Sequence, residues 1–107
     1  MGARYSWRVG IIARRTLRGF WEKPGHQDSE QPLRAWFAEA SKADWATPAD
    51  INKQHRNASI VGNSRVVFHV GGNKNRLVVA FKYEARIAFI RFVGTHAAYD
   101  RIDVEKV

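Results

Sequence analysis

The chain has no cysteine, no long apolar run and few acidic side chains. The absence of cysteine excludes disulfide bonds and zinc sites built from thiolates. No apolar run approaches the roughly 20 residues that a helix needs to cross a bilayer. The opening residues also lack the apolar stretch that follows the basic residues of a secretory signal. These absences predict a cytoplasmic protein that makes no contact with a membrane.

The scarcity of acidic residues leaves the chain strongly basic. Ten Asp and Glu stand against 18 Lys and Arg, which gives a formal net charge of +8. Residues 1–20 contain no acidic residue, residues 53–96 contain only Glu84, and residues 21–52 contain six acidic against three basic residues. This distribution favours a polyanion such as RNA on the basic surface, with the segment 21–52 free for a different contact.

The length of 107 residues fits one compact domain. We expect residues 1–7 to be a flexible extension and residues 8–107 to form the domain. Apolar residues at helical spacing predict helices around Leu17–Trp21 and Leu33–Ala43, the second capped by Asp28 or Ser29. The sequence Thr47-Pro48-Ala49-Asp50 carries a capping pattern and predicts a short helix to about His55.

Period-two alternation replaces the helical spacing after residue 57. It predicts strands around Arg65–Val70, Arg76–Tyr83 and Ile87–Val93, with a tight turn at Gly71-Gly72-Asn73. A short strand is expected at Val9–Ile12. The predicted fold is therefore α+β: an antiparallel sheet made of the N-terminal strand and a C-terminal meander, with two to three helices packed on one face.

Metal-free cleavage of RNA needs a proton acceptor for the 2′-hydroxyl, a proton donor for the leaving 5′-oxygen, and cations for the phosphoryl oxygens. His96 can transfer the proton, and Tyr99 lies within one helical turn of it. Arg76 and Lys82 lie an even number of residues apart and so project from one side of their strand, while Arg91 interrupts an apolar strand. These five residues are the candidate catalytic set.

Each candidate also has a simpler interpretation. His96 and Asp100 can be a structural pair that closes the last turn, Arg76 and Lys82 an ordinary solvated face, and Tyr99 a core residue. The four histidines invite a metal site, but no two have ligand spacing, so we expect no metal and no cofactor.

Several segments of the chain resemble the HigB toxins of bacterial toxin–antitoxin pairs, within the wider RelE-like group. The match is most specific at Gly94-Thr95-His96 with Tyr99-Asp100, and it extends over about residues 8–105. The other matching segments are Asn63-Ser64-Arg65-Val66-Val67-Phe68, Gly72-Asn73-Lys74, Arg76-Leu77-Val78-Val79, Ile90-Arg91-Phe92-Val93, Gln31-Pro32-Leu33, Lys42-Ala43-Asp44-Trp45 and Pro48-Ala49-Asp50-Ile51.

The resemblance implies a RelE-like domain that cleaves messenger RNA on the ribosome and leaves a 2′,3′-cyclic phosphate. It also implies a HigA-type helix-turn-helix antitoxin, with operator DNA bound only through the antitoxin complex. Within the matching motifs, Arg65, Asn73 and Lys74 are the expected RNA contacts.

Two other functions compete with this interpretation. A non-catalytic module that binds RNA or the ribosome explains the charge but gives His96 and Tyr99 no role. An independent DNA-binding protein ranks lower, because no predicted helix is both basic and exposed enough to enter a major groove.

Overall fold

The computed structural model describes residues 9–72 and 74–107. The predicted extension at residues 1–7 lies outside this range. The strands are β1 (Gly10–Ile12), β2 (Ser59–Val61), β3 (Arg65–Val70), β4 (Asn75–Lys82) and β5 (Ile87–Thr95), and the helices are α1 (Arg14–Trp21), α2 (Glu30–Lys42), α3 (Pro48–Gln54) and α4 (His96–Tyr99).

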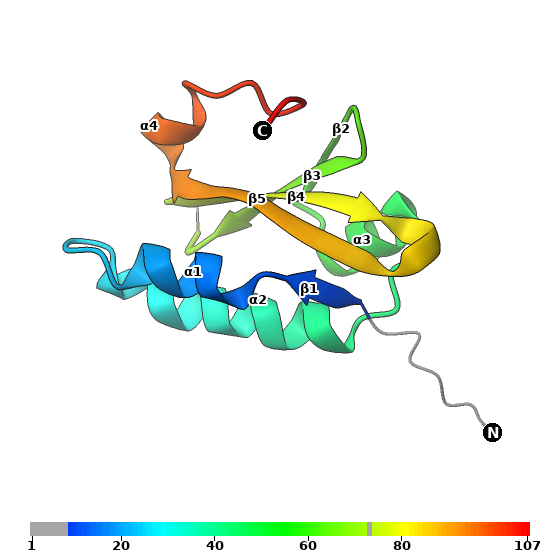
Figure 1. Cartoon of the computed structure of the whole chain (residues 1–107), viewed down its shortest axis with the longest axis horizontal. Helices are drawn as coiled ribbons and strands as arrows, with labels where there is room; N and C mark the ends of the chain where they lie inside the picture. The colour runs from blue at the N-terminus through cyan, green and yellow to red at the C-terminus, as the bar shows by residue number, and fades with distance from the viewer. Residues whose placement is uncertain (1–8, 73) are drawn as a thin grey trace.

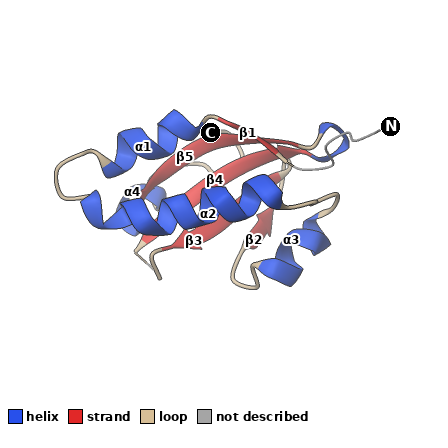
Figure 2. Ribbon diagram, turned by 90° about the horizontal axis from the view of Figure 1, so that it is seen from below, coloured by secondary structure: helices blue, strands red, loops and turns tan. Residues whose placement is uncertain are grey.

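The strands form one sheet in the order β1-β5-β4-β3-β2. In Figure 1 the helices α1 and α2 lie on one side of this sheet, and α4 with the segment that follows it lies on the other. Figure 2 shows α1 and α2 crossing the sheet, with α3 beside its β2 edge. This arrangement confirms the predicted α+β class and the packing of helices against one face.

The sheet is mixed, not purely antiparallel. β2, β3, β4 and β5 pair antiparallel in sequence, whereas β1 pairs parallel with β5, from Gly10 opposite Ile87 to Ile12 opposite Phe89. Three helices, α1, α2 and α3, follow β1 before the chain returns to the sheet, and such a crossover allows a parallel neighbour. The strand β2, only three residues long and largely exposed, was not predicted because it shows no alternation.

One core joins the helices to the sheet. Helical spacing places Leu17, Phe20 and Trp21 on the buried side of α1, as predicted. The strands contribute alternate residues to the same core: Val66, Phe68 and Val70 of β3; Leu77, Val79 and Phe81 of β4; and Ala88 and Ile90 of β5. Each large apolar side chain buried there stabilises the fold by about 1.5–3 kcal/mol.

The start of α2 differs from the prediction that Asp28 or Ser29 caps it. Ser29 is the residue before the helix, but its hydroxyl donates to the carbonyl of His26 (2.6 Å) and accepts no helix N–H. Its backbone is already helical, since a 3₁₀ turn (Gln27–Ser29) runs directly into α2. A capping side chain needs an extended backbone. Asp28 instead pairs with Lys74.

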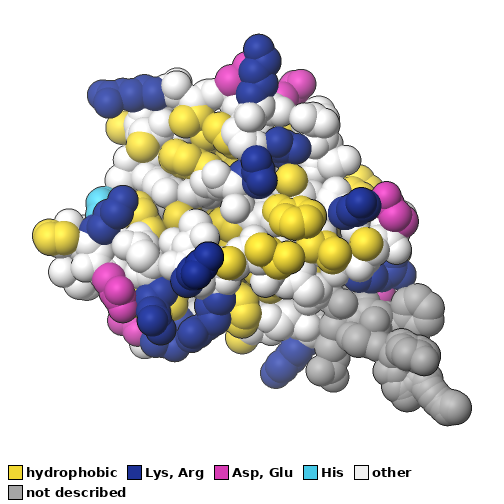
Figure 3. Space-filling model, in the orientation of Figure 1, with side chains coloured by type: hydrophobic (Ala, Val, Ile, Leu, Met, Phe, Trp, Pro, Cys, Tyr) yellow, Lys and Arg dark blue, Asp and Glu magenta, His cyan; other side chains and the backbone are white. Residues whose placement is uncertain are grey.

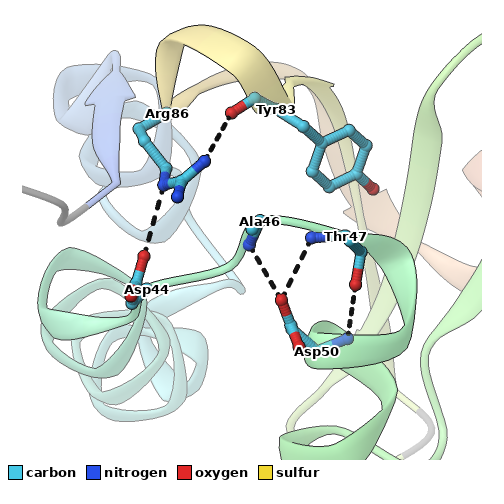
Figure 4. A network of polar contacts seen from close by, with 6 residues as sticks. All are labelled: Asp44, Ala46, Thr47, Asp50, Tyr83 and Arg86. Carbon is cyan, nitrogen blue, oxygen red and sulfur yellow. Dashed lines mark hydrogen bonds and ion pairs between the residues drawn. The ribbon is translucent and has the colours of Figure 1, made fainter.

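The start of α3 has the predicted capping box (Figure 4). The amide of Asp50 donates to the Thr47 hydroxyl (3.3 Å), and the Asp50 carboxylate accepts from the amides of Thr47 (3.1 Å) and Ala46 (3.0 Å). These donors, the Ala46 amide first, lower the pKa of Asp50 below its usual value. Nearby, the Arg86 guanidinium bridges the carboxylate of Asp44 (3.2 Å) and the carbonyl of Tyr83 (3.0 Å). These contacts tie the β4–β5 connection to the loop between α2 and α3.

We expect Thr47→Ala to lower the free energy of unfolding by about 1 kcal/mol, because it removes the side-chain acceptor at the start of α3. Urea denaturation of the purified protein measures this difference. Thr47→Ser keeps the hydroxyl and serves as the control. Equal destabilisation by both substitutions would show that the hydrogen bond does not stabilise the helix.

Candidate ribonuclease site

The site candidates lie on the face of the sheet opposite α1 and α2, which we call the open face. Because side chains alternate along a strand, the residues of β4 that do not enter the core, Arg76, Val78, Ala80 and Lys82, project to this face. Figure 3, in the orientation of Figure 1, does not look straight onto this face; it shows Lys and Arg side chains scattered over the side of the molecule in view, with apolar side chains exposed between them. Cations and apolar surface together are what a single-stranded RNA needs for its phosphates and its bases.

Strand pairing brings Arg76 to the start of α4. Arg76 lies opposite Gly94 and Asn75 opposite Thr95, and the chain turns into α4 directly after Thr95. The Thr95 hydroxyl accepts from the Ala98 amide (3.2 Å) and so caps this helical turn. Two further backbone atoms fix the junction, because the His96 amide donates to the carbonyl of Lys74 (3.2 Å).

Gly94 is required by close packing at this junction. A Cβ atom built on Gly94 would lie 2.6 Å from Cζ of Phe92, which is closer than real Cβ contacts. The ring of Phe92 therefore lies over the backbone of Gly94. This contact explains why glycine precedes Thr95-His96 in the sequence.

Arg76, His96, Tyr99 and Asp100 form what we call the α4 cluster. The guanidinium carbon of Arg76 lies 6.0 Å from the centre of the Tyr99 ring. Nδ1 of His96 lies 3.2 Å from a carboxylate oxygen of Asp100. Arg76 is only 7% exposed, whereas the His96 side chain is 55% exposed. The cluster thus contains a buried cation, a group that can neutralise negative charge, and an exposed imidazole, a group that can transfer a proton.

The imidazole uses Nδ1 in its contact with Asp100, so Nε2 is the nitrogen available to a substrate. A carboxylate that holds one ring nitrogen of a histidine fixes the orientation and protonation of the other. The pair of His96 and Asp100, which the simpler interpretation treats as structural, is therefore present. Its exposure shows that it contributes little to stability, since an exposed ion pair is worth at most about 1 kcal/mol.

The other predicted catalytic residues lie farther along the strands. Lys82 is exposed at the opposite end of β4, six positions from Arg76, or roughly 20 Å at the usual rise of a strand. Arg91 lies at the irregularity where β5 slips against Val78 and Val79, and its Nε donates to the carbonyl of Val107 (3.2 Å). The structure brings neither residue into the α4 cluster.

The predicted RNA contacts are also separated. Arg65, at the start of β3, donates to the carbonyls of Asn63 (2.9 Å) and Val107 (2.5 Å). The ammonium of Lys74 pairs with the carboxylate of Asp28 and is therefore turned toward the beginning of α2. This pairing lowers the pKa of the Asp28 carboxyl below its usual value. Asn73 lies outside the described residues.

Sequence reasoning missed how the segment after α4 returns to the sheet. The Asn63 side chain donates to the carbonyl of Glu105 (2.9 Å), and two arginines reach Val107. Residues 42 or 16 positions apart meet in these contacts, and no local pattern indicates them. The contact of Arg76 with Tyr99 also depends on strand register, although both residues were singled out.

A separate hollow lies between α1 and α2, with a volume of about 430 Å³. Apolar side chains of Leu17, Trp21 and Phe37 line it together with Arg14 and Arg34. The guanidinium carbons of Arg14 and Arg34 lie 5.6 Å and 4.9 Å from the ring centres of Phe37 and Trp21, respectively. This groove belongs to the helical side of the molecule and contains none of the α4 cluster.

Within residues 9–72 and 74–107, no three His, Asp or Glu side chains gather closely enough to hold a metal ion. No helix in this same part of the chain is long and apolar enough to cross a membrane.

Comparison with known proteins returns one family. No curated protein matches the chain. The family model described as "HigB_toxin, RelE-like toxic component of a toxin-antitoxin system" matches residues 29–102, which include β2 to β5, α2, α3 and the whole α4 cluster. The chain therefore belongs to the HigB toxin family, the RelE-like toxic components of toxin–antitoxin systems.

Proposed function

We propose that this toxin is a metal-independent endoribonuclease that cleaves messenger RNA on the ribosome and thereby stops translation and growth. The observation that carries the proposal is the α4 cluster, which contains a nearly buried arginine beside a tyrosine ring and, on the same helical turn as the tyrosine, an exposed histidine held by a carboxylate. Family membership supplies the toxic role and an antitoxin partner. The cluster supplies a chemistry by which toxicity can arise.

In the proposed reaction the 2′-oxygen of one nucleotide attacks the adjacent phosphorus and loses its proton. The bond from phosphorus to the 5′-oxygen breaks, and that oxygen takes up a proton. The products are a 2′,3′-cyclic phosphate and a 5′-hydroxyl. His96 exchanges one of these two protons through Nε2, and Arg76 neutralises the charge that builds on the phosphoryl oxygens. The Tyr99 ring keeps the guanidinium of Arg76 in place.

The partners in this proposal are the ribosome and its bound mRNA, and a HigA-type helix-turn-helix antitoxin through which operator DNA is bound. All three are cytoplasmic. The groove between α1 and α2, most of whose lining residues belong to the segment 21–52, is the surface we assign to the antitoxin. It lies on the side of the sheet opposite the α4 cluster (Figure 1), so antitoxin and RNA would use different faces.

We expect purified toxin, added to ribosomes translating a defined mRNA, to create new RNA 5′ ends that carry hydroxyl groups. The matching 3′ ends should carry 2′,3′-cyclic phosphates, because a neighbouring hydroxyl and not a metal-bound water is the nucleophile. Mapping the ends by ligation, with and without prior treatment by polynucleotide kinase, measures both. Ends with 5′-phosphates would contradict the mechanism, and binding to ribosomes without new ends would favour a non-catalytic module.

A further inference from the structure

A second histidine lies directly opposite Arg76 in the sheet. The register pairs Arg76 of β4 with His69 of β3 on one side and with Gly94 of β5 on the other. Residues opposed in this way have Cβ atoms about 4.5–5.5 Å apart on the same face of the sheet. Because its neighbours Phe68 and Val70 enter the core, His69 projects with Arg76 to the open face, where it is partly buried. An imidazole on β3 therefore lies beside the cation of the α4 cluster.

The proposed reaction needs two proton transfers, and His96 performs only one of them. The other needs a second group that can gain or lose a proton near neutral pH, and histidine is the usual residue for this task. In the proposed reaction the ring of Tyr99 holds Arg76, and Lys82 lies roughly 20 Å from Arg76 along β4. His69 is thus of the right chemical type and is placed next to the cation that would bind the phosphate.

The two histidines lie on opposite sides of β4. The amide of His96 donates to the carbonyl of Lys74, so His96 continues the register between β4 and β5 beyond Thr95. From the usual spacings of a sheet, the backbones of His69 and His96 lie about 10 Å apart across the strands and about 7 Å apart along them. A phosphate bound by Arg76 would lie between them. In an in-line displacement the attacking and leaving oxygens lie on opposite sides of phosphorus, and such a pair of groups can serve both oxygens.

The part of β3 that carries His69 is open at its outer edge. β2 pairs only with the segment Arg65–Val67, so no other strand of the described chain lies beside His69 there. Two hollows of about 230 and 180 Å³ lie at this edge, and both are lined by His55 and His69. Arg56 lines the first and Glu39 the second, and they are the other charged groups of this region. Solvent and an RNA strand can therefore reach His69 from the edge of the sheet.

We propose that His69 is the second proton-transfer group of the reaction. One histidine accepts the proton of the 2′-hydroxyl as the bond from the 2′-oxygen to phosphorus forms. The other donates a proton to the 5′-oxygen as its bond to phosphorus breaks. One imidazole gains a proton and the other loses one, and exchange with solvent restores both before the next cleavage. The inference rests on the proposed function and deepens it, because it completes the acid and base pair around Arg76.

The first test replaces His69 with each of the two side-chain amides. His69→Asn and His69→Gln keep a hydrogen-bonding group but cannot exchange a proton. We expect both to slow single-turnover cleavage on translating ribosomes by roughly 10²- to 10⁴-fold. Affinity for a 2′-O-methyl RNA, which lacks the nucleophile, should be unchanged, as should the midpoint of thermal denaturation. His26→Gln is the matched control and should cleave at the wild-type rate. A folded amide variant that cleaves at the wild-type rate would overturn the proposal.

The dependence of the cleavage rate on pH separates proton transfer from a structural role. The wild-type rate should rise and then fall with pH, since one imidazole must be neutral and the other charged. His69→Gln and His96→Gln should each lose one limb of this profile, and not the same limb. His55→Gln, at the same edge of the sheet, should keep both limbs. Both limbs in His69→Gln, or a limb lost in His55→Gln, would show that His69 is not the second group.

An mRNA with sulfur in place of the bridging 5′-oxygen at the cleaved position distinguishes the acid from the base. A thiolate leaves without a proton, so the variant that lacks the acid should recover the wild-type rate on this mRNA, whereas the variant that lacks the base should remain slow. We expect recovery for one of His69→Gln and His96→Gln, and not for the other. Recovery of both variants, or of neither, would contradict the pairing of the two histidines.

Failure of this inference differs from failure of the ribonuclease proposal. If wild-type toxin cleaves mRNA and the folded His69 variants cleave equally fast, the ribonuclease proposal stands and the role of His69 is wrong. If wild-type toxin makes no new mRNA ends, both proposals are wrong.

Discussion

Replacing His96 with alanine is expected to slow mRNA cleavage by roughly 10²- to 10⁴-fold, the usual contribution of a general acid or base, and to abolish growth arrest. The fold should be unaffected, since the imidazole is 55% exposed and its ion pair with Asp100 is at the surface. Cleavage is measured by counting new mRNA ends on translating ribosomes. Folding is checked by thermal denaturation.

His26→Ala is the matched control, because His26 stacks on Phe20 at a centroid distance of 4.4 Å and is not a member of the α4 cluster. It should retain full activity. Arg76→Lys tests the other half of the site: it keeps the positive charge but loses the planar group beside Tyr99, and we expect a loss of roughly 10²–10³-fold. Folded variants of both His96 and Arg76 that remain fully toxic would refute the assignment of the α4 cluster.

The largest expected loss of stability follows from Phe68→Ala, about 3–5 kcal/mol. Phe68 is 1% exposed, and its ring contacts the rings of Trp36, Trp45, His55 and Phe81. Truncation leaves a cavity among four aromatic or imidazole neighbours that cannot collapse into it. Since small domains are stable by only about 5–15 kcal/mol, a large part of the variant should be unfolded at moderate urea concentrations.

Ile60→Ala is the corresponding control on β2, where the side chain is 42% exposed. It should change the free energy of unfolding by no more than about 0.5 kcal/mol. Equilibrium denaturation in urea compares the two variants directly. A Phe68→Ala variant as stable as Ile60→Ala would mean that the aromatic cluster is not the centre of the core.

Features encoded by neighbouring residues were predictable from the sequence. The spacing of Leu17, Phe20 and Trp21 gave the buried side of α1, and the Thr47–Asp50 pattern gave the capping box. Alternation predicted the three long strands. These signals act over one or two turns of chain, where geometry alone decides which side chains meet.

Features that depend on contacts between distant segments were not predictable. The parallel pairing of β1 with β5 depends on the path of the chain through the helices that follow β1. The sequences of the two strands contain no signal for their direction relative to each other. The prediction that Asp28 caps α2 was wrong, because Asp28 pairs instead with Lys74, which lies 46 positions away in the sequence. Physical reasoning from a single sequence has no access to such pairings.

The site shows the same division. His96, Tyr99 and Asp100 could be grouped from helical spacing, and their contact follows from one turn of α4. Adding Arg76 to them required the register between β4 and β5. Lys82 and Arg91 were grouped with the site because of their charge and their place in the alternation of the strands. Alternation predicts the face of the sheet from which a side chain projects, but it does not predict how far along the strand that side chain lies from the site.

The pairing of β1 with β5 has a consequence for synthesis. Residues 10–12 leave the ribosome early, yet their partners at residues 87–89 emerge only when most of the chain is made. At a synthesis rate of about 5–20 residues per second, several seconds separate the two strands. Throughout this interval the sheet is incomplete, and His96 is not yet synthesised. Under the proposed mechanism, we therefore expect a nascent chain of this toxin to be unable to cleave mRNA until residues 96–100 have been translated.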